Sequence, residues 1–330
     1  MRLVAPYQGA DDRRAWLQVL TSFLPFVAGW WLMAASLQFG LALTVVLAVP
    51  TAGFLVRIFI IQHDCGHGSF FASRRLNDAV GFLCGVLTLT PYGSWRRSHA
   101  IHHAGAANLA RRGTGDILTL TVDEYLAAPR LRRLLYRIYR HPLTLFVVGP
   151  LFNFVILQRL PFGAGLRGVR ASVLWTNLAL VAAVLLLGGM IGFPTVLIVH
   201  LAVMAVASTA GTWLFYVQHQ YEETYWAPPE TWDYSAAALR GSSYYALPPV
   251  LRWFSGNIGF HHLHHLSPRI PSYALPRCHA ASPLLQQVTT LGLRSSLRSL
   301  RLHLWDAESE RLVGFGALRA IRARCAQRSV

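Results

Sequence analysis

The chain has 330 residues, of which 54% are hydrophobic and 13% charged, whereas a soluble protein carries about 25% charged residues. Its formal net charge is +16, and all 30 basic residues are arginines. Two charge-free windows, residues 15–56 and 171–221, exclude an ordinary soluble fold. In a membrane protein the positive charge indicates a face that lies on anionic lipid, not a nucleic-acid surface.

The first window contains 42 residues (15 to 56), enough for two membrane-spanning helices of about 20 apolar residues each and a tight turn. We predict these helices at about residues 15–38 and 41–61. Pro25 should bend the first helix without ending it. Arg57 lies close enough to the end of the second helix for its side chain to snorkel to the membrane surface. The N-terminal residues lack the pattern of a cleaved signal peptide, so we expect the first helix to remain.

Residues 62–170 are expected on the cytoplasmic side, with three segments at the membrane surface. The apolar run 79–91 is too short to span the membrane and is predicted to be interfacial or re-entrant. Residues 130–142 combine arginines with aromatic residues and suit a helix that lies on the membrane surface. The run 143–157, interrupted by Gly149 and Pro150, is also interpreted as interfacial.

The second window predicts helices at about residues 172–189 and 193–218, with Pro194 in a first turn, where proline is tolerated. Residues 219–330 are predicted to be cytoplasmic. Arginines are concentrated in the N-terminus, the middle segment and the C-terminal third, so the positive-inside rule places both termini in the cytoplasm. The predicted fold is an all-α integral membrane protein, with four transmembrane helices in two hairpins and a cytoplasmic helical cap.

Histidines gather at the predicted cytoplasmic ends of these helices, in the patterns HDCGH, HAIHH and HHLHH. Residues three and four apart share one face of a helix, so HxxxH and HxxHH each direct their imidazoles to a common point. One more histidine directly follows the last predicted span. We therefore predict nine metal ligands, too many for one ion and suitable for two: His63, His67, His99, His102, His103, His219, His261, His264 and His265.

The remaining histidines are interpreted as structural. His141, His200, His279 and His303 stand alone, and His262 points away from its neighbours. The ligand type does not identify the metal, because imidazole binds zinc, copper, iron and nickel alike. The spans carry no acid, which argues against the soluble di-iron carboxylate pattern. A site at the mouth of an apolar bundle is placed to reach a lipid chain, and its unactivated methylenes require a redox metal, so iron is preferred to zinc.

Several segments resemble the membrane fatty acid desaturase family, particularly the bacterial acyl-lipid desaturases. They include HDCGHGSFF, LTPYGSWRRSHAIHHA, RGTGDILTLTVDEY, FYVQHQYEETYW and NIGFHHLHHLSPRIPSY, and the likeness covers most of residues 55–276. The resemblance implies a single membrane-embedded desaturase domain over residues 1–330, with the histidine boxes in its cytoplasmic cap. It also implies two iron ions, with O2 and two electrons used to introduce a cis double bond into the acyl chain of a membrane lipid.

Under this resemblance the nine histidines named above ligate the iron. In animal acyl-CoA relatives an asparagine four residues before the counterpart of His219 completes the site, but this chain has Phe215 there. Asn257, one helical turn before His261, is a candidate substitute, through water more than by direct ligation. Asp64 and Asp116 are candidates to accept the distal N–H of a ligand, and Asp116 equally suits a loop turn. Four aromatic residues are candidates either to line a tunnel for the acyl chain or to anchor the protein at the membrane interface: Tyr92, Trp95, Tyr225 and Trp226.

The sequence contains no haem-binding HPGG segment and no cluster-binding cysteine set, so the electrons should come from a separate protein. The arginine-rich face and the resemblance favour an acidic ferredoxin. The expected location is the bacterial inner membrane, with the active site facing the cytoplasm. The position of the new double bond stays open, with Δ12 favoured over Δ5, Δ9 or another position.

Two rival functions fit parts of the sequence. A di-iron membrane hydroxylase or ketolase acting on an alkane, acyl or carotenoid substrate uses a similar histidine-rich site and inserts oxygen instead. A hydroxylated product without a new double bond would identify this rival. A metal transporter would place ionisable groups along its spans, whereas here only His200 lies in the middle of one.

Overall fold

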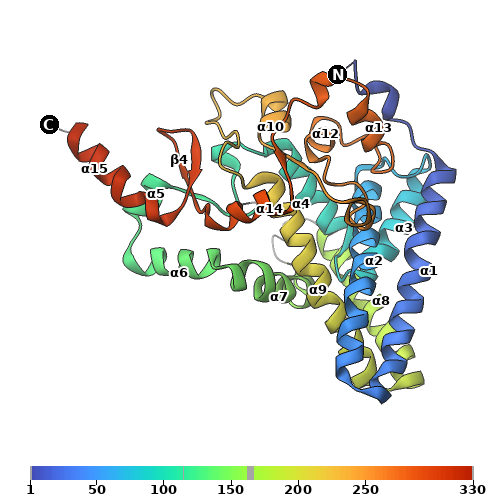
Figure 1. Cartoon of the computed structure of the whole chain (residues 1–330). Coiled ribbons are helices and arrows are strands. Elements are labelled where there is room, and N and C mark those ends of the chain that lie inside the picture. Colours follow the sequence, from blue (N-terminus) through green and yellow to red (C-terminus); the bar gives the residue numbers. More distant parts are fainter. Residues whose placement is uncertain (1, 114, 162–166, 329–330) are drawn as a thin grey trace.

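The computed structural model describes residues 2–113, 115–161 and 167–328. Four long apolar helices form two antiparallel hairpins (Figure 1), and each is long and apolar enough to cross a membrane. The fold is mostly helical, as predicted. The first hairpin pairs α1 (Asp12–Ser36), prolonged by a 3-10 turn (Leu37–Phe39), with α2 (Leu41–His67), and the second pairs α8 (Arg167–Ile191) with α9 (Phe193–His219).

The four long helices pack against each other on one side and leave apolar side chains exposed on the other. Phe26, Met33 and Ile58 are buried in the core that α1, α2 and α9 share. Outward-facing residues such as Val46 and Leu186 are each 66% exposed. The backbone polar groups in the middle of each helix are bonded within the helix, and the outward-facing side chains there are largely apolar, which suits contact with lipid.

The first hairpin differs from its prediction at two points. Helix α2 continues six residues past residue 61, so His63 and His67 lie on the helix itself and not after it. Gly68 ends the helix with a φ of 67°, and its amide donates to the carbonyls of Asp64 and Cys65. Pro25 lies inside α1 without ending it, as expected.

Arg57 does not snorkel to the surface, because partners lie closer to it than the membrane boundary. Its side chain is buried, its Nε donates to the Ser22 hydroxyl at 3.1 Å, and its Nη1 donates to the carbonyl of Trp253. The guanidinium also lies 4.0 Å from the centre of the Trp253 ring. Arg57 therefore joins α1, α2 and a C-terminal segment inside the bundle.

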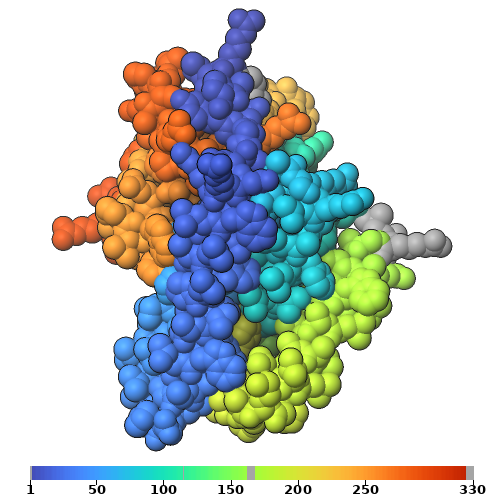
Figure 2. Space-filling view, turned by 90° about the vertical axis from the view of Figure 1, so that its right-hand side faces the viewer, coloured from blue at the N-terminus to red at the C-terminus, as the bar shows by residue number. Residues whose placement is uncertain are grey.

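Two helices, α3 (Arg74–Leu87) and α4 (Tyr92–Gly105), form a shorter antiparallel pair between the hairpins. The run predicted as interfacial or re-entrant, residues 79–91, forms most of α3 and the turn into α4. Both helices pack against α2 and α8. Figure 2 shows this cyan segment beside the blue N-terminal hairpin and above the yellow-green α8.

The middle segment continues with α5 (Val122–Ala127), α6 (Arg130–Arg140), a π-helical turn (Thr144–Val148), α7 (Gly149–Val155) and a 3-10 turn (Leu157–Arg159). The two halves, 130–140 and 144–159, are bent by 65° where Pro142 interrupts the helix. In Figure 1, α6 and α7 lie across the direction of the four long helices. One face of α6 exposes an apolar stripe at helical spacing, consistent with a helix on the membrane surface: Leu131, Leu134, Leu135 and Ile138.

The C-terminal third forms the cap over one end of the bundle. Its helices are α10 (Tyr234–Arg240), α11 (Pro249–Phe254), α12 (His261–Leu266), α13 (Leu275–Ala280), α14 (Leu293–Ser296) and α15 (Leu318–Arg328). Short strands, which the sequence did not predict, tie the cap to the middle segment. Strand β4 (Leu304–Asp306) lies between β1 (Leu120–Thr121), parallel to it, and β5 (Arg311–Val313), antiparallel to it. Strand β2 (Tyr244–Tyr245) pairs in parallel with β3 (Thr290–Leu291).

Helix α11 lies alongside a predicted span, although residues 219–330 were expected outside the membrane. A Cβ on Gly53 of α2 would come within 2.8 Å of the Phe254 ring, and a Cβ on Gly256 would come within 2.8 Å of Ile60. The absence of a side chain at both glycines thus lets this segment approach α2 closely. The outer face of α11 exposes Val250 and Trp253.

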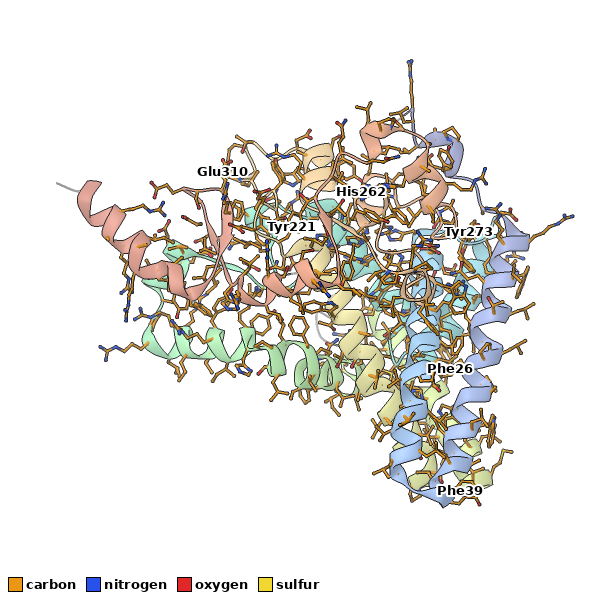
Figure 3. The ribbon with its side chains drawn as sticks, in the orientation of Figure 1. Phe26, Phe39, Tyr221, His262, Tyr273 and Glu310 are labelled. Carbon is orange, nitrogen blue, oxygen red and sulfur yellow. The ribbon has the colours of Figure 1, made fainter. Side chains whose placement is uncertain are left out.

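The two ends of the molecule differ in composition. Figure 3 places Phe39 at the tip of the first hairpin and His262 at the opposite end, within the cap. The N-terminus lies at the cap end too (Figure 1), where the Asp11 amide donates to the Tyr273 hydroxyl at 2.7 Å. The chain therefore has an apolar end and a polar end that carries the histidines.

Candidate metal centre

Four elements bring the predicted ligands together at the cap end of the bundle (Figure 1). Helix α2 contributes two histidines from its last two turns, α4 contributes three, α9 contributes its last residue and α12 contributes three. The helical spacing works as predicted on α2, α4 and α12, because residues three and four apart lie on one side of each helix. All nine predicted ligands are therefore neighbours in space.

The histidines fall into two groups. In the first group the ligand atoms all lie within 4.8 Å of one another, and its members are His63, His67, His99, His103 and His264. The second group, within the same limit, comprises His102, His219 and His265. His261 adjoins the second group, since its Nε2 lies 2.9 Å from Nε2 of His219 and 3.1 Å from Nε2 of His265.

The spacing of the ring nitrogens fits metal ligation. Within the first group, Nε2 of His264 lies 3.0 Å from Nε2 of His63 and 2.9 Å from Nε2 of His103. Imidazole nitrogens bind a divalent ion at about 2.1 Å, so two ligands at right angles are separated by about 3 Å. The two groups thus have the number and spacing of donors that two ions require.

Most of these imidazoles are buried, and several of their nitrogens have no hydrogen-bond partner. Among the described residues, Nε2 of His67 and both ring nitrogens of His102 are buried without a hydrogen bond. Leaving such a nitrogen unsatisfied costs about 1–3 kcal/mol, which a metal ion would offset. Burial, reinforced by neighbouring imidazoles, holds the pKa well below its usual value of 6.5 for the six histidines on α4 and α12: His99, His102, His103, His261, His264 and His265. They are therefore neutral at pH 7, the form that binds metals.

Two groups outside the cluster contact the rings of predicted ligands. Asp64 contacts His63, as its position suggested: its Oδ1 lies 3.0 Å from Nδ1, while its Oδ2 accepts a hydrogen bond from the Ser272 amide at 2.6 Å. Nδ1 of His219 lies 3.1 Å from the carbonyl oxygen of Gly241, to which it donates. Each contact leaves Nε2 directed toward the cluster.

Asp116 borders the second group across a cavity of about 20 Å³, enough for a single water molecule. Its Oδ1 accepts a hydrogen bond from the Gly113 amide at 2.7 Å, so it also makes the loop turn considered for it. Burial raises the pKa of Asp116 to about 6. Phe215 and Gln220 line the same cavity, together with His102 and His219.

Asn257 lies in a different setting from the one expected. Helix α12 begins only at His261, so Asn257 is not one helical turn before it but stands in the preceding loop with a φ of 61°. Its Nδ2 donates to the Ser272 carbonyl at 3.1 Å. Both features give Asn257 a role in the chain turn, and its place as a water-mediated ligand stays a prediction.

The four aromatic candidates separate into two pairs. Trp95 stacks on His99, with ring centres 4.5 Å apart, and Trp226 lines the cavity beside His102. Tyr92 lies lower on α4, where its hydroxyl donates to the Cys65 carbonyl at 2.8 Å. Tyr225 stays in a loop, with its hydroxyl bonded to Thr231. Only Trp95 and Trp226 thus reach the histidines.

The histidines interpreted as structural lie outside both groups. His262 directs Nε2 to the Leu285 carbonyl at 3.0 Å, and His303 stacks on Phe315. Sequence reasoning missed the Gly241 carbonyl and the Ser272 amide, because each is a backbone group that the fold brings in from a distant segment. Gln220, next to His219, could have been found from its position alone.

A family model and a curated relative that match this chain carry the same description. The model of the family described as "Fatty acid desaturase" matches residues 40–290. A "Fatty acid desaturase" from Bacillus subtilis is 45% identical over 318 residues, which cover 96% of this chain and 90% of that protein.

More distant relatives have more specific descriptions. An "sn-1 oleoyl-lipid 12-desaturase" from Synechocystis is 28% identical, over 78% of this chain and 75% of that protein. An "sn-1 acyl-lipid omega-3 desaturase (ferredoxin)" from Synechocystis is also 28% identical, over 69% of this chain and 64% of that protein. The region that the family model matches, residues 40–290, contains all nine clustered histidines.

Proposed function

Because the chain belongs to the membrane fatty acid desaturase family, an O2-dependent class of oxidoreductases, we propose that it introduces a cis double bond into the acyl chain of a membrane lipid. The observation that carries this proposal is the pair of buried histidine groups at the end of four apolar helices. An acyl chain in the bilayer can approach such a site without crossing water.

We propose that the nine clustered histidines hold two iron ions, five ligands around one ion and four around the other. Iron bound in this way would supply the oxygen activation that removal of hydrogen from an unactivated methylene requires. The chain's own residues bind and orient. Asp64 and the Gly241 carbonyl keep Nε2 of His63 and His219 directed inward, and the fold buries six of the nine imidazoles.

The position of the double bond is proposed as Δ12, in preference to Δ5 or Δ9. This choice has the support of one relative described as an sn-1 oleoyl-lipid 12-desaturase. Trp95 and Trp226 are proposed to border the acyl chain, because Trp95 stacks on His99 and Trp226 lines the cavity that His102 and His219 also line. Tyr225 lies apart from the groups and is proposed as an anchoring residue, whereas Tyr92 is buried, with its hydroxyl bonded to the Cys65 carbonyl.

The electron donor is proposed to be an acidic ferredoxin. A distant relative carries ferredoxin in its description, and 30 arginines against 14 acidic residues suit an acidic partner. Desaturation by the purified chain should therefore require an added ferredoxin system. Full turnover with NAD(P)H alone would contradict this part of the proposal.

The proposed location is the bacterial inner membrane, with both termini and the histidine groups on the cytoplasmic side. The arginine distribution supports this orientation. We propose one domain over residues 1–330, because both terminal segments join the body of the protein: Gln8 bonds to Ser267 at 2.9 Å, and β4 pairs with β1. A reagent that cannot cross the membrane should label Phe39→Cys from the periplasm, and labelling only in inverted vesicles would reverse the orientation.

Expression in a host that lacks polyunsaturated lipids tests the central proposal. Mass spectrometry should find a new double bond in the acyl chains of the host lipids, and the fragment masses give its position. His102→Ala should abolish it. A hydroxylated or keto product without new unsaturation would instead identify the rival oxygen-inserting function.

A further inference from the structure

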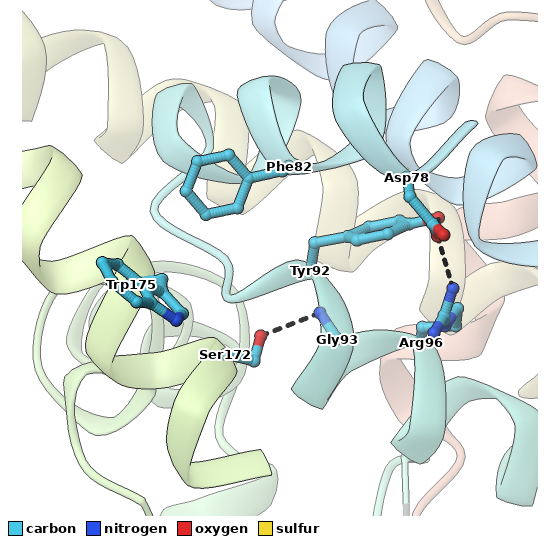
Figure 4. Close-up of a pocket in the computed structure, with 7 residues that line it drawn as sticks. All are labelled: Asp78, Phe82, Tyr92, Gly93, Arg96, Ser172 and Trp175. Atoms are coloured by element: carbon cyan, nitrogen blue, oxygen red, sulfur yellow. Dashed lines mark hydrogen bonds and ion pairs between the residues drawn. The ribbon is translucent and has the colours of Figure 1, made fainter. Parts of the chain in front are cut away.

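A cleft of about 470 Å³ opens between α3, α4 and α8, outside the histidine groups (Figure 4). It is formed by residues from all three helices: Asp78, Phe82, Tyr92, Gly93, Arg96, Ser172 and Trp175. None of these side chains belongs to the predicted ligand set. The cleft is therefore separate from the predicted metal centre.

The cleft lies near the membrane boundary. Ser172 and Trp175 belong to the first turns of α8, and the charge-free stretch of this helix begins at residue 171. Trp175 is 62% exposed, and exposed tryptophans near the ends of spans are typical of the interface between head groups and acyl chains. A lipid of the adjoining leaflet thus has direct access to the cleft.

The two ends of the cleft differ in chemistry, as Figure 4 shows. Phe82 and Trp175 lie at one end, both with exposed rings. At the other end Arg96 donates from Nη1 to Oδ1 of Asp78 at 2.7 Å. The Arg96 side chain is 41% exposed, and its guanidinium lies 5.3 Å from the centre of the Tyr92 ring.

The charged end has a surplus of one positive charge. Asp78 also lies within 4.0 Å of the Arg74 Nε, so two arginines share one carboxylate. The first amides of α4 do not add to this surplus, because those of Gly93 and Ser94 donate to the Ser172 hydroxyl. Recognition of an anion at this end therefore falls to the arginines, and chiefly to Arg96, which lines the cleft.

We propose that the cleft binds an anionic phospholipid of the adjoining leaflet. Arg96 contacts the phosphodiester, which a guanidinium matches well. Phe82 and Trp175 pack against the glycerol and the first part of the acyl chain. The single surplus charge favours a lipid with one net negative charge over a zwitterionic one. The site goes beyond the proposed function, since it does not depend on the reaction at the histidines.

The test measures lipid binding by the purified, delipidated full-length chain. Native mass spectrometry should find phosphatidylglycerol bound more tightly than phosphatidylcholine with the same acyl chains. Arg96→Gln should weaken phosphatidylglycerol binding about tenfold, because it removes a charge-assisted hydrogen bond. Arg319→Gln, the same charge change at an exposed position on α15, is the matched control and should leave binding unchanged.

A second pair of variants separates lipid recognition from structural support. Asp78→Asn should tighten phosphatidylglycerol binding, because the carboxylate competes with the phosphate for Arg96. Trp175→Ala should weaken binding of both lipids. Equal loss in Arg96→Gln and Asp78→Asn would mean that the ion pair only supports the fold and would overturn the proposal. Equal affinity for the two lipids would also overturn the proposal. These binding measurements do not require desaturase activity.

Discussion

Asp64 joins His63, a predicted ligand of the first histidine group, to a loop 208 positions away in the sequence. One carboxylate oxygen lies 3.0 Å from Nδ1 of His63, and the other accepts the Ser272 amide at 2.6 Å. The carboxylate therefore holds the His63 proton on Nδ1 and leaves Nε2 unprotonated toward the histidine cluster, the form that metal ligation would need. Second partners of this kind set both the tautomer and the angle of a ligand ring.

Asp64→Asn should accordingly lower iron affinity by about 10- to 100-fold, the usual effect of losing such a partner. The side-chain oxygen of the asparagine can still accept a hydrogen bond from the Ser272 amide, so the fold should be kept. Iron per protein, measured by elemental mass spectrometry across a series of chelator concentrations, gives the affinity. Glu223→Gln removes an exposed acid elsewhere and serves as the control. Unchanged iron retention in Asp64→Asn would show that Asp64 does not orient the ligand.

At the scale of the element, the end of α2 decides where His67 stands. Gly68 takes a φ of 67°, a left-handed conformation that costs other residues about 1 kcal/mol. A Cβ at Gly68 would meet nothing within 4 Å, so the cost of a substitution there is in the backbone alone.

Gly68→Ala should therefore destabilise the protein by about 1 kcal/mol and lower iron occupancy through His67. Gly211→Ala is the matched control, because Gly211 lies inside α9, also with open space at its Cβ. Alanine favours a helix over glycine by about 1 kcal/mol, so this control should stabilise if it changes anything. Unfolding in mixed micelles measures the stability of both variants. Equal changes in the two variants would mean that the left-handed conformation of Gly68 has no particular importance.

Helix α11 provides a second test at this scale. It packs against residues 53–60 of α2 and exposes Val250, Leu251 and Trp253, which we expect to face acyl chains. Val250→Cys should react much more slowly with a membrane-impermeant maleimide than Glu223→Cys on an exposed loop. Cys65, Cys84 and Cys278 are buried, and both variants also carry Cys325→Ser, so that the background stays low. Equal labelling rates in membranes would place α11 in water.

At the scale of the whole molecule, the features that depend on local spacing were predictable. Charge-free windows located the four long helices, and the intervals between histidines placed each set on one helix face. The structure confirms both, because length and periodicity are properties of contiguous sequence. The clustering of His219 with His261 also followed from their shared position near one end of the bundle.

Contacts between distant segments could not be read in the same way. The fate of Arg57 depends on Trp253, and the orientation of His219 on the Gly241 carbonyl. The end of α2 was misplaced because the polar HDCGH segment lowers hydropathy without breaking the helix. The short strands escaped prediction because two or three residues carry no measurable period.

The histidine groups also connect the whole molecule, since they join the two hairpins, α4 and the cap. Ions that bind only the folded protein stabilise it, by about 2.7 kcal/mol when free metal exceeds the dissociation constant 100-fold. Without ions, neutral imidazoles and unpaired nitrogens remain buried together, which favours loosening of the cap.

Chelation should therefore lower the melting temperature of the wild-type protein, and added ferrous iron should restore it. In His102→Ala the iron-dependent part of the shift should shrink, because one ligand of the second group is missing. His262 is a buried histidine on the same helix as His261, but its Nε2 bonds to the Leu285 carbonyl. The variant His262→Ala should therefore be less stable than the wild type but keep the full iron-dependent shift in melting temperature. A thermal melt with and without iron separates the two contributions. Equal iron-dependent shifts in both variants would mean that the clustered histidines do not bind the metal that stabilises the fold.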